Sequence, residues 1–336
     1  MRKIKIFING FGRIGRTIAR IALCEMQDKI SIVGVNDPEN AEILSYLLAH
    51  DSVHNVDKIQ QEFKEGKYIF NGCEIPFSQH KNPKDIDILD ADVVLEASGL
   101  FLTQKEVESH LAKGAKRVIF TAPAKDSTKT FVLGVNHTKY SGEKIISNAS
   151  CTTNALAPIV MLLDEAFSVE NGILTTIHSY TNDQNLIDAA HRKNDFRRSR
   201  AAAINMIPTT TGAAKALHLV LPNMQGRLHG HSVRVPVPNV SMVDLSVLLK
   251  NKADKEAINN LFIEASKGRL AGILGVDSNY GVSQDFLNCP LSGIVALDLT
   301  FNLGNMAKIM AWYDNEWGYS HRVLEMAIYI LKGEQC

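Results

Sequence analysis

Two side chains in this sequence have the types needed for nucleophilic catalysis. Cys151 lies in the run Ser-Cys-Thr-Thr-Asn, residues 150–154, which precedes an apolar stretch, residues 155–162, that predicts a helix with an irregularity at Pro158. A thiol at a helix N-terminus feels the positive end of the helix dipole, so we expect a lowered pKa for Cys151. His178 lies in an expected strand, residues 172–180, and is a candidate base for the thiol. An inert buried cysteine and an ordinary core histidine remain the alternative from these residues alone.

A glycine-rich motif near the start of the chain predicts dinucleotide binding. Residues 10–15 read Gly-Phe-Gly-Arg-Ile-Gly, between an expected strand at residues 4–8 and an expected helix at residues 15–26. Glycines there let the backbone turn tightly and approach a pyrophosphate at the helix N-terminus. Asp37 closes the next expected strand, about 20 residues on, where an acid binds the ribose hydroxyls. The pattern favours NAD over NADP or a flavin, and a purely structural glycine turn is the alternative.

Arginines and threonines of the second half are candidates for binding phosphate groups through charge-assisted hydrogen bonds. Arg234 lies between two valines in an expected strand, where an unpaired charge is costly, so we expect an anionic partner. The basic run at residues 197–200 is also compatible with a solvated turn or an RNA-facing patch. Its threonine neighbours favour a small anionic substrate. The set comprises Thr181, Arg197, Arg198, Arg200, Thr209, Thr210, Thr211, Gly212 and Arg234.

The elements that must position these residues differ between the two halves of the chain. In the first half, strands alternate with helices, which requires crossover connections and predicts an α/β fold with a Rossmann-type, doubly wound parallel sheet. The expected strands are residues 4–8, 30–35, 91–97, 118–120, 131–135 and 144–146.

The second half contains longer strand-like segments, several of which alternate polar and apolar residues. They predict an α+β catalytic domain with a large, mainly antiparallel sheet. These segments are residues 172–180, 232–237, 241–250, 295–302 and 306–314. We therefore expect a dinucleotide-binding domain at residues 1–150 and a catalytic domain at residues 151–314. The remainder, residues 315–336, contains an amphipathic helix that returns to the first domain.

Composition narrows the class of protein. The chain has 336 residues, of which 45% are hydrophobic and 21% charged, as in ordinary two-domain globular proteins. Lys+Arg and Asp+Glu both number 36, which argues against nucleic acid or a membrane surface as the main partner. The N-terminal residues lack a secretory signal and no apolar stretch is long enough to span a membrane, so we expect a cytoplasmic protein. Five scattered cysteines argue against both a disulfide framework and a metal site.

Six motifs taken together resemble the phosphorylating glyceraldehyde-3-phosphate dehydrogenase family. The resemblance runs through the whole chain in order, and the Ser-Cys-Thr-Thr-Asn run around Cys151 is its most specific part. The motifs are residues 9–16 (Asn-Gly-Phe-Gly-Arg-Ile-Gly-Arg), 147–154 (Ser-Asn-Ala-Ser-Cys-Thr-Thr-Asn), 175–181 (Thr-Thr-Ile-His-Ser-Tyr-Thr), 211–215 (Thr-Gly-Ala-Ala-Lys), 234–236 (Arg-Val-Pro) and 312–319 (Trp-Tyr-Asp-Asn-Glu-Trp-Gly-Tyr).

The resemblance implies a reversible oxidation of glyceraldehyde 3-phosphate, with NAD and inorganic phosphate, to 1,3-bisphosphoglycerate. Cys151 would form a hemithioacetal and then a thioester, with His178 as the general base. The Cys151 backbone N–H and the protonated His178 would stabilise the oxyanion. The family is homotetrameric, and residues 180–203 resemble its loop that lines a neighbour's cofactor pocket.

The resemblance also implies individual binding roles. Thr181 and Arg234 would hold the C3 phosphate of the substrate, and Asn315 the nicotinamide amide. The inorganic phosphate would lie among Ser150, Thr152, Thr211 and Gly212, with one of Arg197 and Arg198 beside them, and we select Arg198. The cofactor-binding set would be Gly10, Gly12, Arg13, Ile14, Gly15, Asp37, Lys81, Thr121 and Asn315.

Two positions depart from the family pattern. Ala155 replaces a second cysteine that many members carry, and that cysteine is not the nucleophile. Ala189 and Ala190 stand where strictly NAD-dependent bacterial members have Leu-Pro or Gly-Pro, and small residues there resemble forms that tolerate NADP. Because Asp37 argues the other way, we expect NAD to be preferred, with NADP as a second cofactor.

Two rival functions fit parts of the sequence. Erythrose-4-phosphate dehydrogenase uses the same cysteine and histidine, but its members lack the run at residues 210–215. A non-catalytic relative that binds nucleotides or RNA is a rival from another class. The presence of Cys151, His178 and Arg234 argues against lost chemistry, and zero net charge argues against RNA.

Overall fold

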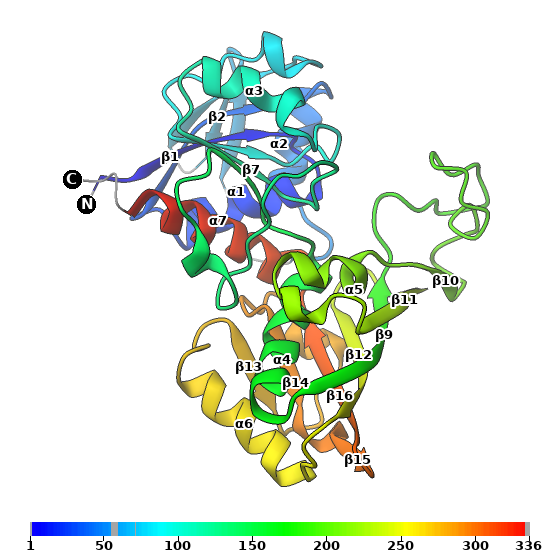
Figure 1. Ribbon diagram of the computed structural model, residues 1–336. Helices are drawn as coiled ribbons and strands as arrows, with labels where there is room; N and C mark the ends of the chain where they lie inside the picture. The colour runs from blue at the N-terminus through cyan, green and yellow to red at the C-terminus, as the bar shows by residue number, and fades with distance from the viewer. Residues whose placement is uncertain (1, 55–59, 71, 333–336) are drawn as a thin grey trace. The chain divides into compact units, whose positions relative to one another are not determined.

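The computed structural model describes residues 2–54, 60–70 and 72–332, and the chain forms two compact units (Figure 1). The first unit contains the described residues up to Phe131, Thr138–Ser150 and the described residues from Ser320 onward. The second contains Val132–His137 and Cys151–Tyr319. The domain limits expected from the sequence, residues 1–150, 151–314 and 315–336, stay a prediction.

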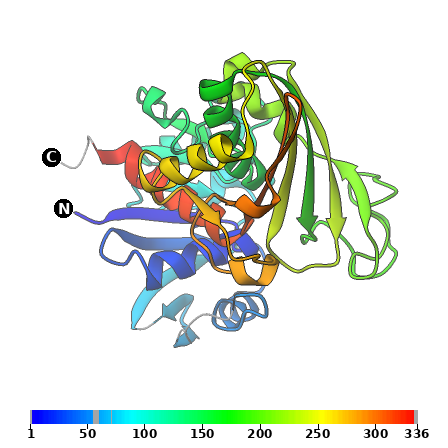
Figure 2. The ribbon, with the colours of Figure 1, turned by 90° about the horizontal axis from the view of Figure 1, so that it is seen from below.

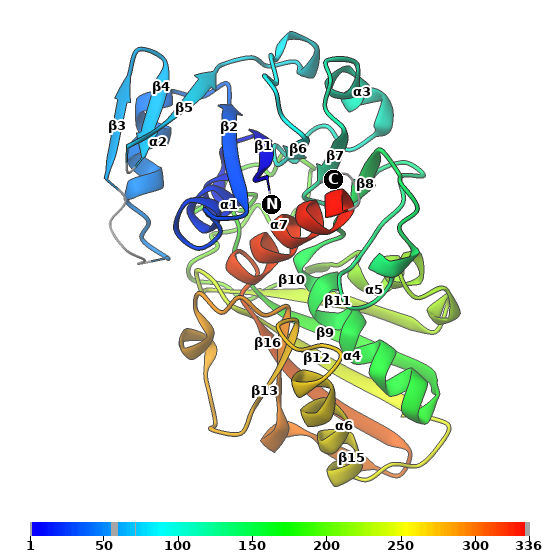
Figure 3. The same cartoon turned by 90° about the vertical axis from the view of Figure 1, so that its left-hand side faces the viewer.

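The first unit is built on one sheet in the order β3-β4-β5-β2-β1-β6-β7-β8, which Figure 3 shows as a continuous row of strands. From β5 to β8 all neighbouring strands are parallel, whereas β3 and β4 add antiparallel hairpins. The strands are β1 (Ile4–Asn9), β2 (Ile30–Asn36), β3 (Gln61–Lys64), β4 (Lys67–Phe70), β5 (Cys73–Ser78), β6 (Val93–Glu96), β7 (Arg117–Phe120) and β8 (Ile145–Ser147). The helices are α1 (Arg13–Cys24), α2 (Ala41–Ala49), α3 (Gln104–Ala112) and, from Ser320 onward, α7 (Trp317–Leu331).

The central strands form because their apolar, β-branched runs are buried on both faces, as parallel sheets require. Phe7, Val94, Val118 and Phe120 belong to one buried cluster, to which α3 contributes Val107. The Rossmann-type sheet predicted from the alternating pattern is confirmed. The hairpins of β3 and β4 were not predicted, because their strands are short and half-exposed.

The predicted strand at residues 131–135 is wrong. Thr130 makes a single bridge to Ser147, and residues 133–136 form a turn. Gly134 adopts φ 78°, and a Cβ there would lie 2.8 Å from the side chains of Leu270 and Ile273. The apolar residues of this segment are buried as a turn rather than as a strand.

The second unit is built on a mixed, mainly antiparallel sheet in the order β10-β11-β9-β12-β16-β14-β13, with β15 paired to β16. The pairs β9–β11 and β13–β14 are parallel. The strands are β9 (Val169–Ser179), β10 (Ile207–Thr210), β11 (Leu228–Val235), β12 (Ser241–Leu249), β13 (Leu274–Asp277), β14 (Gly293–Ala296), β15 (Phe301–Leu303) and β16 (Met306–Tyr313). The helices include α4 (Cys151–Phe167), α5 (Ala213–Ala216) and α6 (Lys255–Lys267).

Helix α4 packs against β9, β12, β14 and β16 and also contacts α6. Figure 2 shows the two helices, green and yellow, on the same side of this sheet. Pro158 lies inside α4, as expected, and the helix begins at Cys151 itself. The large, mainly antiparallel sheet predicted for the second half is confirmed.

One predicted strand of this sheet is interrupted. The segment expected to be continuous at residues 295–302 contains the end of β14, a 3₁₀ turn at Leu297–Leu299 and the start of β15. Two carbonyl groups of the turn, on Leu297 and Asp298, accept hydrogen bonds from Asn259 and Lys255 of α6. Side chains of the helix therefore satisfy backbone groups that a continuous strand would have paired.

Within the described part of the chain, no helix is long and apolar enough to cross a membrane.

A buried ion cluster fixes α1 in the first unit. Asp51 contacts the guanidinium groups of Arg20, at 2.6 Å, and Arg13, at 2.9 Å. Burial favours the neutral acid, but Arg13 and the backbone N–H groups of His54 and Val53 hold the pKa of Asp51 well below its usual range. The cluster therefore carries its charges at neutral pH, with Arg20 2% exposed.

We expect Asp51→Asn to lower the free energy of unfolding by about 3 kcal/mol, because Arg20 would stay buried without a counter-ion. Asp90→Asn is the control, since Asp90 forms an exposed ion pair with Lys5 and its loss should cost less than about 1 kcal/mol. Urea unfolding at pH 7 measures both. Equal losses in the two variants would contradict the account.

Candidate active site

The second unit brings the predicted nucleophile and base together. Cys151 is the first residue of α4, and His178 is the penultimate residue of β9. The Cys151 Sγ lies 3.7 Å from the His178 Nε2, although 27 residues separate them in sequence. His178 is 6% exposed, and Cys151 is partly exposed. The base is thus enclosed by the protein, whereas the residue that carries the thiol keeps some exposed surface.

The other imidazole nitrogen decides how the pair exchanges a proton. His178 Nδ1 lies 2.8 Å from the Ser179 carbonyl oxygen and 3.1 Å from the Arg234 guanidinium. A proton on Nδ1 donates to the carbonyl and leaves Nε2 as an acceptor for the thiol. A bare Nδ1 accepts from Arg234 and leaves an N–H on Nε2 that donates to a thiolate. The site therefore accommodates both tautomers of the imidazole.

Burial controls the ionisation of this pair. Loss of solvation raises the pKa of Cys151, and Arg234 and hydrogen bonds with Thr152 oppose that shift. Loss of solvation, together with the charge of Arg234, lowers the pKa of His178 to about 3. The prediction of a lowered Cys151 pKa is wrong, because desolvation outweighs the charges nearby. At neutral pH a neutral thiol faces a neutral imidazole that is placed to take its proton.

Tyr313 connects the two elements that carry the pair, a role that the sequence did not reveal. Its hydroxyl lies 2.9 Å from the Thr152 Oγ1 in α4 and 2.8 Å from the Thr176 Oγ1 in β9. Its ring lies edge-on to His178, with centroids 6.0 Å apart. The Thr152 hydroxyl, expected near inorganic phosphate, is therefore engaged with Tyr313. The motif around Tyr313 pointed to the family but to no task for this hydroxyl.

Arg234 enters the same group from β11, directly opposite His178 in the strand register. One guanidinium nitrogen contacts the Ser179 carbonyl at 2.9 Å and the Thr181 Oγ1 at 3.0 Å. The Nε is buried and has no hydrogen-bond partner among the residues that the structure describes. Thr181 in turn donates to Asp183, whose charge opposes the burial that lowers the pKa of Arg234. Asp183, which the sequence analysis missed, supplies the expected negative charge.

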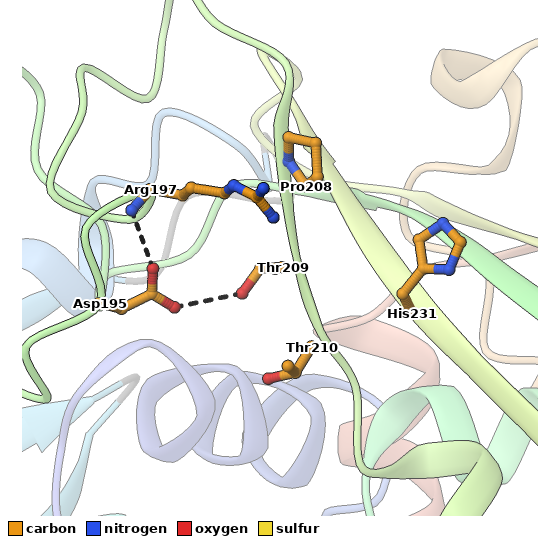
Figure 4. Close-up of a pocket in the computed structure, with 6 residues that line it drawn as sticks. All are labelled: Asp195, Arg197, Pro208, Thr209, Thr210 and His231. Carbon is orange, nitrogen blue, oxygen red and sulfur yellow. Dashed lines mark hydrogen bonds between the residues drawn. The ribbon is translucent and has the colours of Figure 1, made fainter.

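Arg198, rather than Arg197, joins this group. Arg198 pairs with Asp183, and its Nε donates to the Thr209 Oγ1 at 3.0 Å. Its charge also contributes to lowering the pKa of His178 and Arg234. Arg197 instead lines a pocket at the edge strand β10 (Figure 4), where its backbone N–H donates to Asp195. The pocket is lined by Asp195, Arg197, Pro208, Thr209, Thr210 and His231.

The remaining residues expected at the inorganic phosphate are less closely connected. Thr211 Oγ1 accepts the Ala213 N–H at the start of α5, and Gly212 is exposed. Within the described residues, no hydrogen bond joins either one to Cys151 or Arg234. Ser150 is partly exposed and belongs to the first unit.

Asn315 is oriented by two serines that the sequence did not single out. Its side-chain oxygen accepts hydrogen bonds from the Ser241 Oγ, at 2.7 Å, and the Ser179 Oγ, at 3.0 Å. Because these donors assign the oxygen of the amide, the NH₂ group must point the other way. An NH₂ donor with a fixed direction suits the carboxamide oxygen of a nicotinamide.

In the first unit, the three glycines of the loop differ in what they contact. Gly10 has φ 96°, and a Cβ there would lie 2.4 Å from the Ser98 nitrogen. A Cβ on Gly15 would lie 2.1 Å from the Gly10 oxygen. A Cβ on Gly12 would meet nothing within 4 Å, and α1 begins there with neither a side-chain cap nor an acid in its first turn. The helix N-terminus is therefore open, as a pyrophosphate requires.

The other predicted cofactor residues surround the loop in the first unit. Asp37 accepts the Phe11 N–H at 2.6 Å and the Glu39 N–H at 3.0 Å, which ties the loop to the end of β2. The Arg13 side chain is directed to Asp51, so its backbone rather than its charge remains for a ligand. Ile14 is partly exposed, Lys81 is exposed, and the Thr121 hydroxyl donates to the Glu96 carbonyl.

Comparison with known proteins agrees with this geometry. The glyceraldehyde 3-phosphate dehydrogenase NAD binding domain matches residues 4–104, and the C-terminal domain of the same family matches residues 150–315. The chain belongs to the glyceraldehyde-3-phosphate dehydrogenase family. The resemblance read from the motifs is thereby confirmed.

Curated relatives named glyceraldehyde-3-phosphate dehydrogenase match over nearly their whole length. The Helicobacter pylori protein is 54% identical, over 96% of this chain and 98% of its own. The Bacteroides fragilis protein is 46% identical over the same shares. The protein named glyceraldehyde-3-phosphate dehydrogenase 1 from Bacillus cereus is 46% identical, over 97% of this chain and 98% of its own.

As a member of this dehydrogenase family, the chain is an NAD-dependent oxidoreductase, and NAD is confirmed as its cofactor. The open N-terminus of α1 and the free space above Gly12 fit the pyrophosphate of NAD. No group of three or more His, Cys, Asp or Glu side chains is arranged to hold a metal ion in the parts of the chain described.

The charge of Arg234 should be visible in the reactivity of Cys151. Because burial raises the pKa of the thiol and Arg234 opposes this rise, Arg234→Leu should move the pH profile of iodoacetamide alkylation to higher pH, by about one unit. Arg269→Leu removes an exposed arginine paired with Glu165 and should leave the profile in place. The test compares the rates of Cys151 alkylation in the wild type and the two variants between pH 6 and 10. An unshifted profile in Arg234→Leu would contradict the assignment.

Proposed function

We propose that this chain catalyses the reversible oxidation and phosphorylation of D-glyceraldehyde 3-phosphate to 1,3-bisphosphoglycerate, with NAD and inorganic phosphate, in glycolysis and gluconeogenesis. The observation that carries the proposal is the Cys151 Sγ 3.7 Å from the His178 Nε2, with Arg234 in contact with the same imidazole. The names of the curated relatives support the choice of substrate.

Cys151 and His178 would carry out the covalent steps. The His178 Nε2 takes the thiol proton as the sulfur attacks the aldehyde carbon, which gives a hemithioacetal. The Cys151 backbone N–H at the start of α4 and the protonated imidazole stabilise the oxyanion. NAD, when bound, accepts the hydride that leaves the hemithioacetal carbon. The resulting thioester is attacked by inorganic phosphate, and the departing thiolate recovers its proton.

Arg234 and Thr181 would bind the C3 phosphate of the substrate. They already lie 3.0 Å apart, and the buried Nε of Arg234 is an open donor for an anion. The inorganic phosphate would lie near Arg198, with Ser150, Thr152, Thr211 and Gly212 as its further contacts. In both places the phosphate would compete with Asp183 for the guanidinium groups.

NAD would be held by the residues around the glycine loop and by the NH₂ group of Asn315. Asp37 favours NAD, because its carboxylate would repel the 2′-phosphate of NADP. Ala189 and Ala190 leave room for a lower level of NADP use. The proposed cofactor contacts are Gly10, Gly12, Arg13, Ile14, Gly15, Asp37, Lys81, Thr121 and Asn315.

We also propose a homotetramer in the cytoplasm, the latter following from the metabolic role. Large apolar side chains are exposed on the segment that follows β9, and burial against other copies of the chain would remove them from water. They are Leu186, Ile187, Phe196, Ile204 and Met206.

NADH formation tests the reaction. With glyceraldehyde 3-phosphate and NAD we expect turnover that requires inorganic phosphate, a thousandfold or greater loss in Cys151→Ser, and a roughly 100- to 10,000-fold loss in His178→Asn. With NADP, kcat/KM should be lower but measurable. Faster turnover with erythrose 4-phosphate would assign the rival dehydrogenase, and NAD binding without turnover of either sugar would overturn catalysis.

Sedimentation tests the assembly. The wild type should have the mass of four 37.1 kDa chains. The double variant Leu186→Ser/Phe196→Ser should dissociate at protein concentrations where the wild type does not, because both side chains are more than three-quarters exposed in the single chain. A wild type that sediments as one chain would reject the tetramer.

A further inference from the structure

Four polar residues form a row along the carboxyl edge of the first unit's sheet. Ser78, Asn36, Asn9 and Glu96 are the last residues of the neighbouring strands β5, β2, β1 and β6. The strand register places Asn9 opposite both Asn36 and Glu96, and Asn36 opposite Ser78. Asn9, Asn36 and Glu96 are each at most 2% exposed. A buried carboxylate at this edge requires hydrogen-bond donors.

The hydrogen bonds along this row all run in one direction. The Ser78 hydroxyl donates to the Asn36 Oδ1 at 2.9 Å, and the Asn36 Nδ2 donates to the Asn9 Oδ1 at 2.9 Å. The Asn9 Nδ2 donates to the Glu96 Oε2 at 2.6 Å. An ionised carboxylate only accepts hydrogen bonds, so Glu96 requires the NH₂ group of Asn9 to face it. The backbone N–H and carbonyl of His80 fix the Asn36 amide in the matching direction.

The second oxygen of Glu96 holds the turn that follows β6. Both the backbone N–H and the hydroxyl of Ser98 donate to the Oε1. The same Ser98 nitrogen would lie 2.4 Å from a Cβ on Gly10, so this turn and the glycine loop are in close contact. One carboxylate thus holds both Ser98 and Asn9, and Asn9 is the residue before Gly10.

The row also reaches the other turns that carry proposed cofactor contacts. The Asn36 side chain exchanges two hydrogen bonds with the backbone of His80, the residue before Lys81. The Glu96 carbonyl accepts both the N–H and the hydroxyl of Thr121. The turns bearing Gly10, Lys81 and Thr121 are therefore all linked to this one row.

We propose that Glu96 is a positioning residue for NAD, whose carboxylate holds Asn9 and Ser98 in place beside Gly10 of the glycine loop. The proposal rests on the proposed cofactor contacts of the first unit. Glu96 acts through Asn9 and Ser98, and it need not touch NAD itself.

The groups around Glu96 explain why its ionisation matters. His110 of α3 places its Nε2 4.0 Å from the Glu96 Oε2, and neither ring nitrogen has a hydrogen-bond partner in the described parts of the chain. Burial and the charge of Lys113 together lower the pKa of His110 to about 4, so the imidazole is neutral at pH 7. Burial raises the pKa of Glu96 to about 7, with Glu106 adding to the rise. Among the residues that the structure describes, Asn9 and Ser98 are the ones that donate hydrogen bonds to the carboxylate.

Protonation of Glu96 would weaken the row. The Ser98 hydroxyl would have to turn and accept the acid proton, and the N–H donors of Asn9 and Ser98 would then face a neutral carboxyl group, which is a weaker acceptor. Because the folded-state pKa is raised, the ionised form and the intact row prevail above pH 7 and are lost as the pH falls below it. NAD, which requires the aligned turns, should bind more weakly at lower pH.

The test replaces Glu96 with its isosteric amide. Glu96→Gln puts an NH₂ group against the donors of Asn9 or Ser98, so we expect the Kd of NAD to rise about tenfold. The kcat at saturating NAD and the KM for glyceraldehyde 3-phosphate should stay within about twofold, because the substrate groups belong to the second unit. Glu106→Gln is the matched control, since its carboxylate caps α3 and faces Thr103 instead. Its melting temperature should fall, but at pH 8, where Glu96 is ionised with or without the charge of Glu106, it should keep the wild-type Kd.

Two further readouts separate positioning from mere stability. The wild-type Kd of NAD should rise as the pH falls from 8 to 6, and this dependence should be absent in Glu96→Gln. The double variant Asn9→Ala/Glu96→Gln should lose less affinity than the sum of its single variants, because both break the same hydrogen bond. Calorimetric titration gives these constants without turnover, so they stand apart from the identity of the substrate.

An unchanged Kd in Glu96→Gln, whether or not its melting temperature falls, would overturn the proposal. So would a wild type that binds no NAD, which is a different failure from NAD binding without turnover of glyceraldehyde 3-phosphate.

Discussion

The buried guanidinium of Arg234 is the constraint around which the polar side chains of the second unit are arranged. A permanent charge that is largely removed from water near the end of a strand needs hydrogen-bond acceptors and a counter-charge, or the fold loses several kcal/mol. The Ser179 carbonyl and the Thr181 hydroxyl accept hydrogen bonds from Arg234, and Asp183 provides the counter-charge. Satisfying Arg234 thereby organises the residues that face Cys151.

The same charge links structure to reactivity. Arg234 favours the thiolate of Cys151 and disfavours protonation of His178, while desolvation opposes the one shift and adds to the other. The outcome is a neutral pair at rest, in which the His178 imidazole is unprotonated and can accept the proton of the Cys151 thiol. Burial raises the pKa of the thiol by more than Arg234 and the hydrogen bonds with Thr152 lower it, so the thiol stays protonated at neutral pH. Tyr313 then keeps α4 and β9 together, so that the sulfur and the imidazole remain in register.

The sequence was sufficient wherever a residue type has few structural options. Gly10 and Gly15 are required by backbone contacts that no Cβ tolerates, and Arg234 among valines implies an anion. Apolar periodicity likewise defined both sheets. It failed at residues 131–135, where the burial of a turn resembles that of a strand, and at residues 295–302, where carbonyls bonded to α6 interrupt the strand.

The residues that the sequence could not reveal are those whose roles depend on distant partners. Asp183, Ser241 and Tyr313 are ordinary in their local context and acquire their tasks only through contacts that the fold creates. Each of them either fixes the orientation of another side chain or balances its charge. Side chains that can both donate and accept, such as asparagine, histidine and serine, have no preferred direction of their own.

The direction of these hydrogen bonds is set by groups that can only donate or can only accept. Arg234 only donates, and it limits what the His178 Nδ1 can do; Glu96 only accepts, and it orients the NH₂ group of Asn9. In each unit, a charged side chain near the end of a strand thus sets the direction of the hydrogen bonds around it. A substitution that keeps shape but reverses this polarity should therefore affect ligand geometry more than it affects the fold.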